Sequence, residues 1–203
     1  MNHINFYSDN SNELSELYNS VSSKKVHESW IEYLPTEGKI LDIGSGNGRD
    51  CKYMHQRGLD VTGIEPSKLL NFAKSSYPDI KWINDTLPHL DSQYYPHSEH
   101  PKYQYDLILC SAVWMHIEPK HRIASLDNML GLLSNIGIIV ITLRYGDFDD
   151  EREGYPIDRS QIEEYCVTMG LEFEIIKNDD CLGRDVWWET IIIKQHERLR
   201  DEQ

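Results

Sequence analysis

Hydrophobic residues along the chain follow two patterns in turn. Short, nearly continuous apolar runs, typical of strands buried in a parallel sheet, cover 39–43, 60–64, 80–83, 105–111 and 137–143. Apolar residues at helical spacing separate these runs and predict helices over 48–57, 67–77, 120–133 and 160–169. Strands that alternate with helices predict an α/β fold, with helices on both faces of a mostly parallel sheet.

The two ends of the chain depart from this alternation. Before the first strand, helical spacing of apolar residues predicts two further helices, over 12–21 and 24–33, and Pro35 ends the second. At the other end, 171–176 and 186–193 are predicted to be strands with no helix between them. Such a pair predicts an antiparallel hairpin at the edge of the sheet.

Composition narrows the class of protein. The 203 residues fit one domain, and 39% apolar with 27% charged residues is typical of a globular chain. Acidic residues outnumber basic ones by 34 to 20, which disfavours a nucleic-acid partner because such partners select basic faces. Residues 1–12 are polar, and the longest apolar stretch, 136–143, is far below the roughly 20 residues of a membrane helix. We expect a cytoplasmic protein with no membrane partner.

The four cysteines, Cys51, Cys110, Cys166 and Cys181, form no C-x-x-C pair. The sequence therefore predicts neither a zinc site nor a redox pair, and no metal is expected.

The strongest chemical motif is Ile40-Leu-Asp-Ile-Gly-Ser-Gly-Asn-Gly48, an apolar strand that ends in a glycine-rich turn and opens a helix. Gly44, Gly46 and Gly48, with Ser45 and Asn47 between them, allow a tight turn and a close approach of the backbone to a ligand. The dinucleotide fingerprint G-x-G-x-x-G would place its third glycine one residue later, where this chain has Arg49.

Asp42 lies just before the glycine turn. A carboxylate there would repel a pyrophosphate and could pair with the ammonium group of a ligand. The turn therefore favours an amino-acid-bearing nucleoside over a nicotinamide dinucleotide.

Polar residues follow the next two predicted strands as well. Glu65, followed by Pro66 and Ser67, ends the second strand, where a carboxylate can accept both hydroxyls of a ribose. Asp85, followed by Thr86 and Leu87, comes after the third strand, where a side-chain acceptor can receive an adenine amino group. Each signal alone has a structural alternative, a plain turn or a neighbour of a helix N-cap. Together they define one crevice at the carboxyl edge of the sheet.

Over about 26–194, the chain resembles the class I methyltransferase family that uses S-adenosylmethionine (SAM). Besides the glycine motif, 63–67 resembles the acidic ribose motif, 84–85 the adenine position, 105–113 the fourth strand and 132–140 the fifth. In the fifth motif, Ile136 replaces the first residue of a Gly-Gly pair, a departure that we expect to affect only a turn.

The resemblance implies a Rossmann-like, seven-stranded, mostly parallel sheet with a final antiparallel strand. It also implies SAM as cofactor, S-adenosylhomocysteine as product, and Ser111 and Ala112 near the reactive sulfonium. The expected organisation is a single domain with parts at 1–35 (helical cap), 36–145 (cofactor core), 146–195 (substrate-side helix and hairpin) and 196–203 (tail).

The acceptor of the methyl group does not follow from these motifs. The chain has Ser111-Ala-Val-Trp-Met-His116 where DNA amino-methylating members carry Asp/Asn-Pro-Pro-aromatic, so a small molecule or a protein side chain is favoured over nucleic acid. A non-catalytic SAM-binding module and an NAD(P)-dependent oxidoreductase remain as alternatives.

His116 is the candidate general base, because it follows the fourth strand and its ordinary pKa suits neutral pH. The alternative is that His116 only orients its loop or caps a nearby helix. On the substrate side, Tyr18 and Trp114 are candidates with core packing as the alternative. Arg144 and Tyr145 end the fifth strand and are expected to face the same crevice, where Arg144 could bind an acidic acceptor or only pair with neighbouring carboxylates.

The acidic segment 147–153 is either a lid that favours a cationic acceptor or a solvated loop. Of the adjacent Trp187 and Trp188, which point to opposite faces of a strand, we expect one to be buried, while the other could reach the substrate side.

Overall fold

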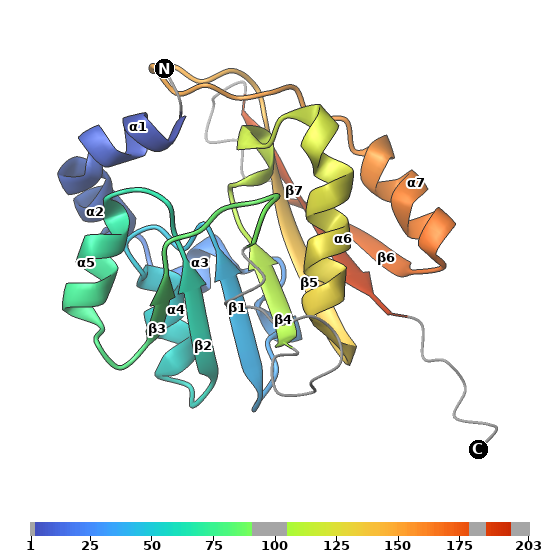
Figure 1. Cartoon of the computed structure of the whole chain (residues 1–203), viewed down its shortest axis with the longest axis horizontal. Helices are drawn as coiled ribbons and strands as arrows, with labels where there is room; N and C mark the ends of the chain where they lie inside the picture. The colour runs from blue at the N-terminus through green and yellow to red at the C-terminus, as the bar shows by residue number, and fades with distance from the viewer. Residues whose placement is uncertain (1–2, 91–104, 179–185, 196–203) are drawn as a thin grey trace.

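The computed structural model describes residues 3–90, 105–178 and 186–195 (Figure 1). Seven strands lie in this part of the chain: β1 (Lys39–Ile43), β2 (Asp60–Ile64), β3 (Lys81–Ile83), β4 (Tyr105–Cys110), β5 (Leu133–Tyr145), β6 (Glu172–Asn178) and β7 (Trp187–Lys194). The α-helices are α1 (His3–Asp9), α2 (Ser11–Asn19), α3 (Ser23–Val26), α4 (Arg49–His55), α5 (Leu69–Ser76), α6 (Arg122–Leu132) and α7 (Ser160–Met169). Short 3₁₀ turns cover Ile31–Tyr33, Trp114–His116 and Pro119–His121.

The strands form one sheet in the order β3-β2-β1-β4-β5-β7-β6. Neighbours from β3 to β5 run parallel, whereas β7 runs antiparallel to both β5 and β6. The predicted seven-stranded sheet with a final antiparallel strand is therefore confirmed. The order reverses between β1 and β4, and that reversal leaves a crevice at the carboxyl ends of the strands.

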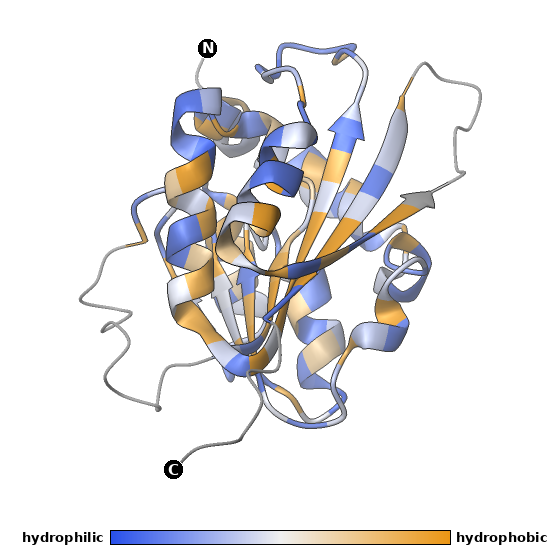
Figure 2. Ribbon diagram, turned by 90° about the vertical axis from the view of Figure 1, so that its right-hand side faces the viewer, coloured by the Kyte–Doolittle hydropathy of each residue, from blue (hydrophilic) through white to orange (hydrophobic). Residues whose placement is uncertain are grey.

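Each face of the sheet carries its own core. On one face, Met54 of α4 and Trp30 pack against Ile40, Leu107 and Val140. On the other face, α6 and α7 bury a second set of side chains against the sheet, including Leu41, Ile108, Leu126, Met129 and Ile162. Figure 2 shows hydrophobic residues along much of the central strands, as expected for strands that are covered by helices on both faces.

The N-terminal segment differs from the prediction. The helix expected over 24–33 is wrong: α3 ends at Val26, and a turn then leads into the 3₁₀ segment Ile31–Tyr33. The turn forms because His27 and Trp30, both buried, bond to each other (Trp30 Nε1 donates to His27 Nδ1, 3.2 Å) and pack on the sheet. The sequence did not predict α1, which carries no fully buried residue.

The fifth strand is longer than predicted. It begins at Leu133, directly after α6, and its register against β4 shifts between Tyr105 and Leu107. The expected turn around Ile136 is therefore part of the strand, with Ile136 exposed. No helix in the described ranges is long and apolar enough to cross a membrane. The predicted tail, 196–203, lies outside the described residues.

Candidate active site

A pocket of about 900 Å³ lies along the carboxyl edge of the sheet. Its wall runs from Asp85 after β3, past Glu65 after β2 and the glycine turn after β1, to Ser111 after β4 and Trp188 on β7. Ligand pockets of proteins usually have volumes of about 300–1,000 Å³. Figure 1 shows α1 and α2 at this edge of the sheet.

The glycine turn needs its glycines for space and for backbone shape. Gly44 and Gly46 have φ values of 72° and 57°, which residues with side chains rarely adopt. A Cβ on Gly44 would lie 2.2 Å from Val113 Cγ2, whereas one on Gly46 would lie 3.6 Å from the Tyr18 ring. The turn is therefore packed against the end of β4, with α2 over it.

Glu65 faces the glycine turn from the end of β2. Its carboxylate accepts from the backbone N–H of Gly46 (2.9 Å) and of Ser67 (2.8 Å). Burial raises the pKa of Glu65, and the bonds from the two N–H groups oppose that rise. We name Gly44–Gly46, Glu65, Asp85 and Thr86 the glycine-loop end of the pocket.

Two residues of the motif use their side chains to hold α2. Asn47 Nδ2 donates to the Ser15 carbonyl and to Asn19 Oδ1, both at 3.1 Å. Arg49 Nη1 donates to the carbonyl oxygen of Tyr18 (3.1 Å). Both residues line the pocket. Their polar side-chain groups, however, fix the helix that covers it.

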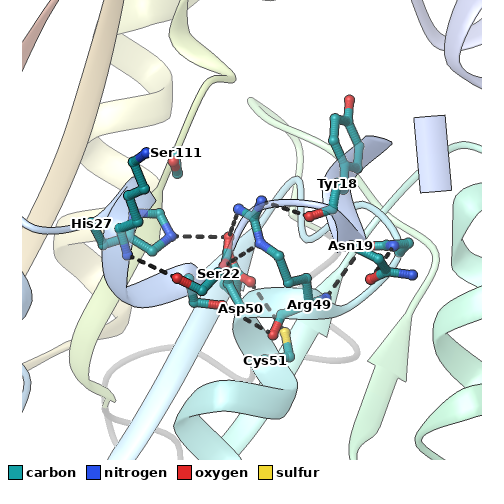
Figure 3. A network of polar contacts seen from close by, with 12 residues as sticks. Tyr18, Asn19, Ser22, His27, Arg49, Asp50, Cys51 and Ser111 are labelled. Atoms are coloured by element: carbon teal, nitrogen blue, oxygen red, sulfur yellow. Dashed lines mark hydrogen bonds and ion pairs between the residues drawn. The ribbon is translucent and has the colours of Figure 1, made fainter. Parts of the chain in front are cut away.

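The first turn of α4 also fixes α3 (Figure 3). Asp50 accepts from Arg49 Nε (2.8 Å) and Nη2 (2.9 Å), and its Oδ2 lies 3.0 Å from His27 Nε2. Because Trp30 donates to Nδ1 of His27, Nε2 carries the proton and faces the carboxylate. Arg49 and His27 hold the pKa of Asp50 below its ordinary value against the effect of burial.

Asp42 does not reach the pocket. Its side chain is buried and accepts from the Cys51 thiol at 3.1 Å, on the α4 side of β1. Burial raises the pKa of this carboxyl to about 7. The expected pairing of Asp42 with a ligand ammonium therefore has no support in the geometry.

The end of β4 is bonded to β5. Thr142 Oγ1 accepts from the Ala112 N–H (2.8 Å) and lies 3.4 Å from Ser111 Oγ. Ala112 has a φ of 57°, an uncommon conformation for a residue with a side chain. Such backbone strain concentrates at ligand sites. Ser111, Ala112 and Thr142 all line the pocket.

His116 is held on several sides in this site. Its Nδ1 lies 2.8 Å from the carbonyl oxygen of Glu153, and its Nε2 lies 3.0 Å from the hydroxyl of Tyr7. Because a carbonyl oxygen only accepts, Nδ1 carries the proton and Nε2 accepts from Tyr7. The rings of His3 and Phe148 stack on the imidazole at 4.9 and 5.5 Å. We name His3, Tyr7, His116 and Phe148 the His116 cluster.

Burial lowers the pKa of His116 to about 4, so the ring is neutral at physiological pH. Its one basic nitrogen is already bonded to Tyr7. The geometry therefore supports the alternative in which His116 orients its neighbours, with Tyr7 as the polar group that shares the pocket wall.

Phe148 and two arginines, rather than the acids, anchor the segment 147–153. The guanidinium groups of Arg144 and Arg152 lie 4.2 and 4.6 Å from the centre of the Phe148 ring. Asp150 pairs with Arg152 within the segment. Arg144 also donates to the carbonyl oxygens of Gly146 (2.7 Å) and Asp147 (3.0 Å), so it stabilises the turn and does not line the pocket.

Several other predicted site residues lie away from the pocket. Trp114 is fully buried in the α6–α7 core, as is Leu87, and Gly48 packs against Trp82. Tyr145 donates to Glu189 Oε2 (2.7 Å) and stacks on Trp187 at 5.1 Å. The expected burial of one tryptophan is wrong, because Trp187 is exposed and Trp188, which lines the pocket, is half-buried.

The remaining predictions meet in one place. The pocket wall includes these predicted residues: Tyr18, Gly44, Ser45, Gly46, Asn47, Arg49, Glu65, Pro66, Ser67, Asp85, Thr86, Ser111, Ala112 and His116. It also includes residues that no motif indicated, notably His3, Ile4, Tyr7, Lys25, Glu28 and Ile176. Only the fold brings these together, because α1, α3 and β6 are distant from the motifs in sequence. Within the described ranges, no group of three or more His, Cys, Asp or Glu side chains could hold a metal ion.

A family model described as a methyltransferase domain matches residues 12–165. An uncharacterized methyltransferase of Staphylococcus carnosus is 27% identical over 143 residues, 68% of this chain and 62% of its own length. The phosphoethanolamine N-methyltransferase of Plasmodium falciparum is 24% identical over 183 residues, 83% of this chain and 64% of its own length. The chain thus spans less than two thirds of these relatives.

A solved structure shares the fold. The 1,6-didemethyltoxoflavin-N1-methyltransferase of Burkholderia thailandensis, bound to 1,6-didemethyltoxoflavin and S-adenosylhomocysteine, superposes with a TM-score of 0.71 at 14% identity. The match covers 95% of this chain and 87% of that one.

The fold, the crevice and the matched model define the class: the chain belongs to the methyltransferase-domain family. The predicted SAM-dependent family is confirmed, and S-adenosylmethionine is the cofactor of that family.

Proposed function

We propose that this chain transfers a methyl group from SAM to a small molecule. The observation that carries the proposal is the single pocket that joins the glycine-loop end to the His116 cluster. The residues present fit the cofactor. The glycine turn has no Cβ at Gly46, and a buried carboxylate, Glu65, faces the place where a ribose would lie.

In this proposal Glu65 accepts from the ribose hydroxyls, and Asp85 with Thr86 surrounds the adenine. Bound SAM supplies an electrophilic methyl group. Ser111, Ala112 and Thr142, which line the pocket and are hydrogen-bonded to one another, would form the wall beside that group.

The His116 cluster positions the acceptor rather than removing its proton. The Tyr7 hydroxyl gives its proton to His116, so its oxygen lone pairs are left to accept a hydrogen bond from an acceptor N–H or O–H. Orientation of the nucleophile in line with the methyl group supplies most of the rate enhancement in such a reaction. Phe148 and α1 cover the cluster and exclude water.

A small acceptor is favoured over a macromolecule because residues of α1, α2 and α3 line the pocket and Phe148 stacks on His116 of its wall. The wall continues past Ser111 to Ile176 and Trp188, which offer an apolar surface beside the charged Glu28. Two of the similar proteins are named for small acceptors, phosphoethanolamine and 1,6-didemethyltoxoflavin.

Calorimetric titration with S-adenosylhomocysteine tests the cofactor site. Micromolar binding is expected, and Gly46→Arg should abolish it because the side chain would enter the pocket beside Tyr18. The matched control is Gly131→Arg, at a position with nothing within 4 Å of an added Cβ. A folded wild-type protein that binds neither SAM nor its product would refute the proposal.

A panel of small amines, phenols and heteroaromatic compounds, assayed for methyl transfer from labelled SAM, tests the acceptor class. Transfer to protein or nucleic acid alone would contradict a small-molecule acceptor.

A further inference from the structure

Lys25 lies on the wall of the pocket, although no sequence motif includes it. It belongs to α3, whose position is fixed from both sides of this residue. Ser23 Oγ donates to the Arg49 carbonyl (3.4 Å), and His27 faces Asp50 at 3.0 Å. Both partners come directly after the glycine turn, so Lys25 is held beside that turn.

Lys25 differs from the other basic side chains of the pocket wall in its charge and its partners. Arg49 is paired with Asp50. His3 and His116 are neutral at physiological pH, because burial lowers the pKa of each. Among the described residues, no carboxylate lies within 4 Å of the Lys25 ammonium. An exposed ammonium in a pocket is a ready partner for an anionic ligand group.

The order of the strands gives the direction of the ligand. Asp85 follows β3 and Glu65 follows β2, while the glycine turn and Ser111 follow β1 and β4. A nucleoside held by Glu65 and Asp85 therefore directs its other end toward β1 and β4. Lys25 lies on that side, because α3 is bonded to Arg49 and Asp50, which follow the turn after β1. In SAM and S-adenosylhomocysteine that other end is an amino acid, with one carboxylate.

We infer that Lys25 binds the carboxylate of the cofactor's amino-acid end. This inference rests on the proposed function. The sequence suggested Asp42 as a partner of the ligand ammonium and Arg49 as a cofactor-binding residue. Those two residues have other partners, Cys51 and Asp50.

The test compares two ligands that differ by one group. S-adenosylhomocysteine carries the carboxylate, and S-adenosyl-3-thiopropylamine keeps the ammonium but lacks the carboxylate. Lys25→Met should weaken S-adenosylhomocysteine about 10-fold, the scale of one partly exposed charge-assisted hydrogen bond. It should change the affinity for the thiopropylamine by less than about twofold, and Lys25→Arg should restore most of the loss.

Lys24→Met is the matched control, since Lys24 lies on the same helix but not on the pocket wall. Equal losses for both ligands, or no loss for S-adenosylhomocysteine, would overturn the assignment while wild-type binding upholds the proposed function. A wild type that binds neither ligand would overturn the proposed function, and the assignment with it.

Discussion

The two ends of the pocket are built in different ways. At the glycine-loop end, the main contact, Gly46 N–H to Glu65, joins residues 19 positions apart in the turns that follow the adjacent strands β1 and β2. In the His116 cluster, Tyr7 and His116 are 109 positions apart, and Phe148 comes from a third segment. The first end is built from the turns that directly follow adjacent strands, whereas the second is assembled from α1, the turn after β4 and the segment 147–153.

This difference suggests that the two ends of the pocket bind different ligands. The rigid end holds a cofactor common to a large family, and the assembled end can vary with the acceptor. Changes at the glycine-loop end should therefore affect cofactor affinity, and changes in the His116 cluster should affect acceptor turnover.

The largest expected effect is that of Glu65→Gln. The amide keeps the shape of the side chain but loses the charge and one acceptor oxygen, so the bonds to the ribose hydroxyls weaken. We expect the Kd of S-adenosylhomocysteine to rise about 100-fold, equivalent to about 3 kcal/mol. Calorimetric titration measures this, with Glu164→Gln on the exposed face of α7 as control. An unchanged Kd would mean that Glu65 serves only the turn.

The glycine-loop end could be predicted from sequence because its information is local. A strand, three glycines and the acids after the next two strands are consecutive features, and parallel strands bring their ends together without further help. Gly44, Glu65 and Asp85 were found this way. Asp42 was misjudged because alternation along β1 points its side chain toward α4.

The His116 cluster could not be assembled from sequence. The position of His116 after the fourth strand made it a candidate site residue. The helix α1, however, has no buried residue, so no hydrophobic pattern predicts it. Tyr7 and His3 become part of the site through contacts with a loop more than a hundred residues away. Arg144 was predicted to face the crevice, yet its guanidinium lies on Phe148 and bonds to the turn that follows β5.

Two buried groups near the pocket, Asp42 on β1 and His116 in the His116 cluster, should change the stability of the protein in opposite directions as pH rises. Burial raises the pKa of Asp42 from 3.8 to about 7, so the folded protein holds a proton that the unfolded chain releases. Its stabilising contribution is full at acid pH and is lost as pH rises through about 7. Burial lowers the pKa of His116 from 6.5 to about 4. Its contribution is full above pH 6.5 and is lost as pH falls through about 4.

Asp42→Asn should therefore flatten the fall in the free energy of unfolding between pH 3.8 and about 7, and His116→Gln should flatten the rise between about 4 and 6.5. Within each window the slope should change by about 1.4 kcal/mol per pH unit. Urea denaturation at several pH values measures both. The same slope in either variant as in the wild type would show that the corresponding group titrates normally in the folded protein.

A smaller effect is expected from Phe148→Ala. The substitution removes the ring that stacks on His116 and lies against Arg144 and Arg152, so the cluster loosens. We expect kcat/KM for the acceptor to fall about 10-fold, which corresponds to about 1.4 kcal/mol, while the Kd of S-adenosylhomocysteine stays within about twofold. Tyr53→Ala is the control, because it removes an arginine–aromatic contact on α4 away from the cluster. If cofactor affinity fell as much as turnover did, the two ends would not be separable.

The smallest effect should come from Tyr145→Phe, at a residue that ends β5 beside Arg144 but faces away from the pocket. Its hydroxyl donates to Glu189, which also pairs with Arg159, so the bond links β5 to β7 and to the start of α7. Loss of this bond should lower the free energy of unfolding by about 1 kcal/mol. It should leave kcat/KM and cofactor Kd within about twofold, because no atom of the pocket wall moves. A larger kinetic effect would show that the β5–β7 contact controls how the segment 147–153 closes, and the His116 cluster would then extend to the far edge of the sheet.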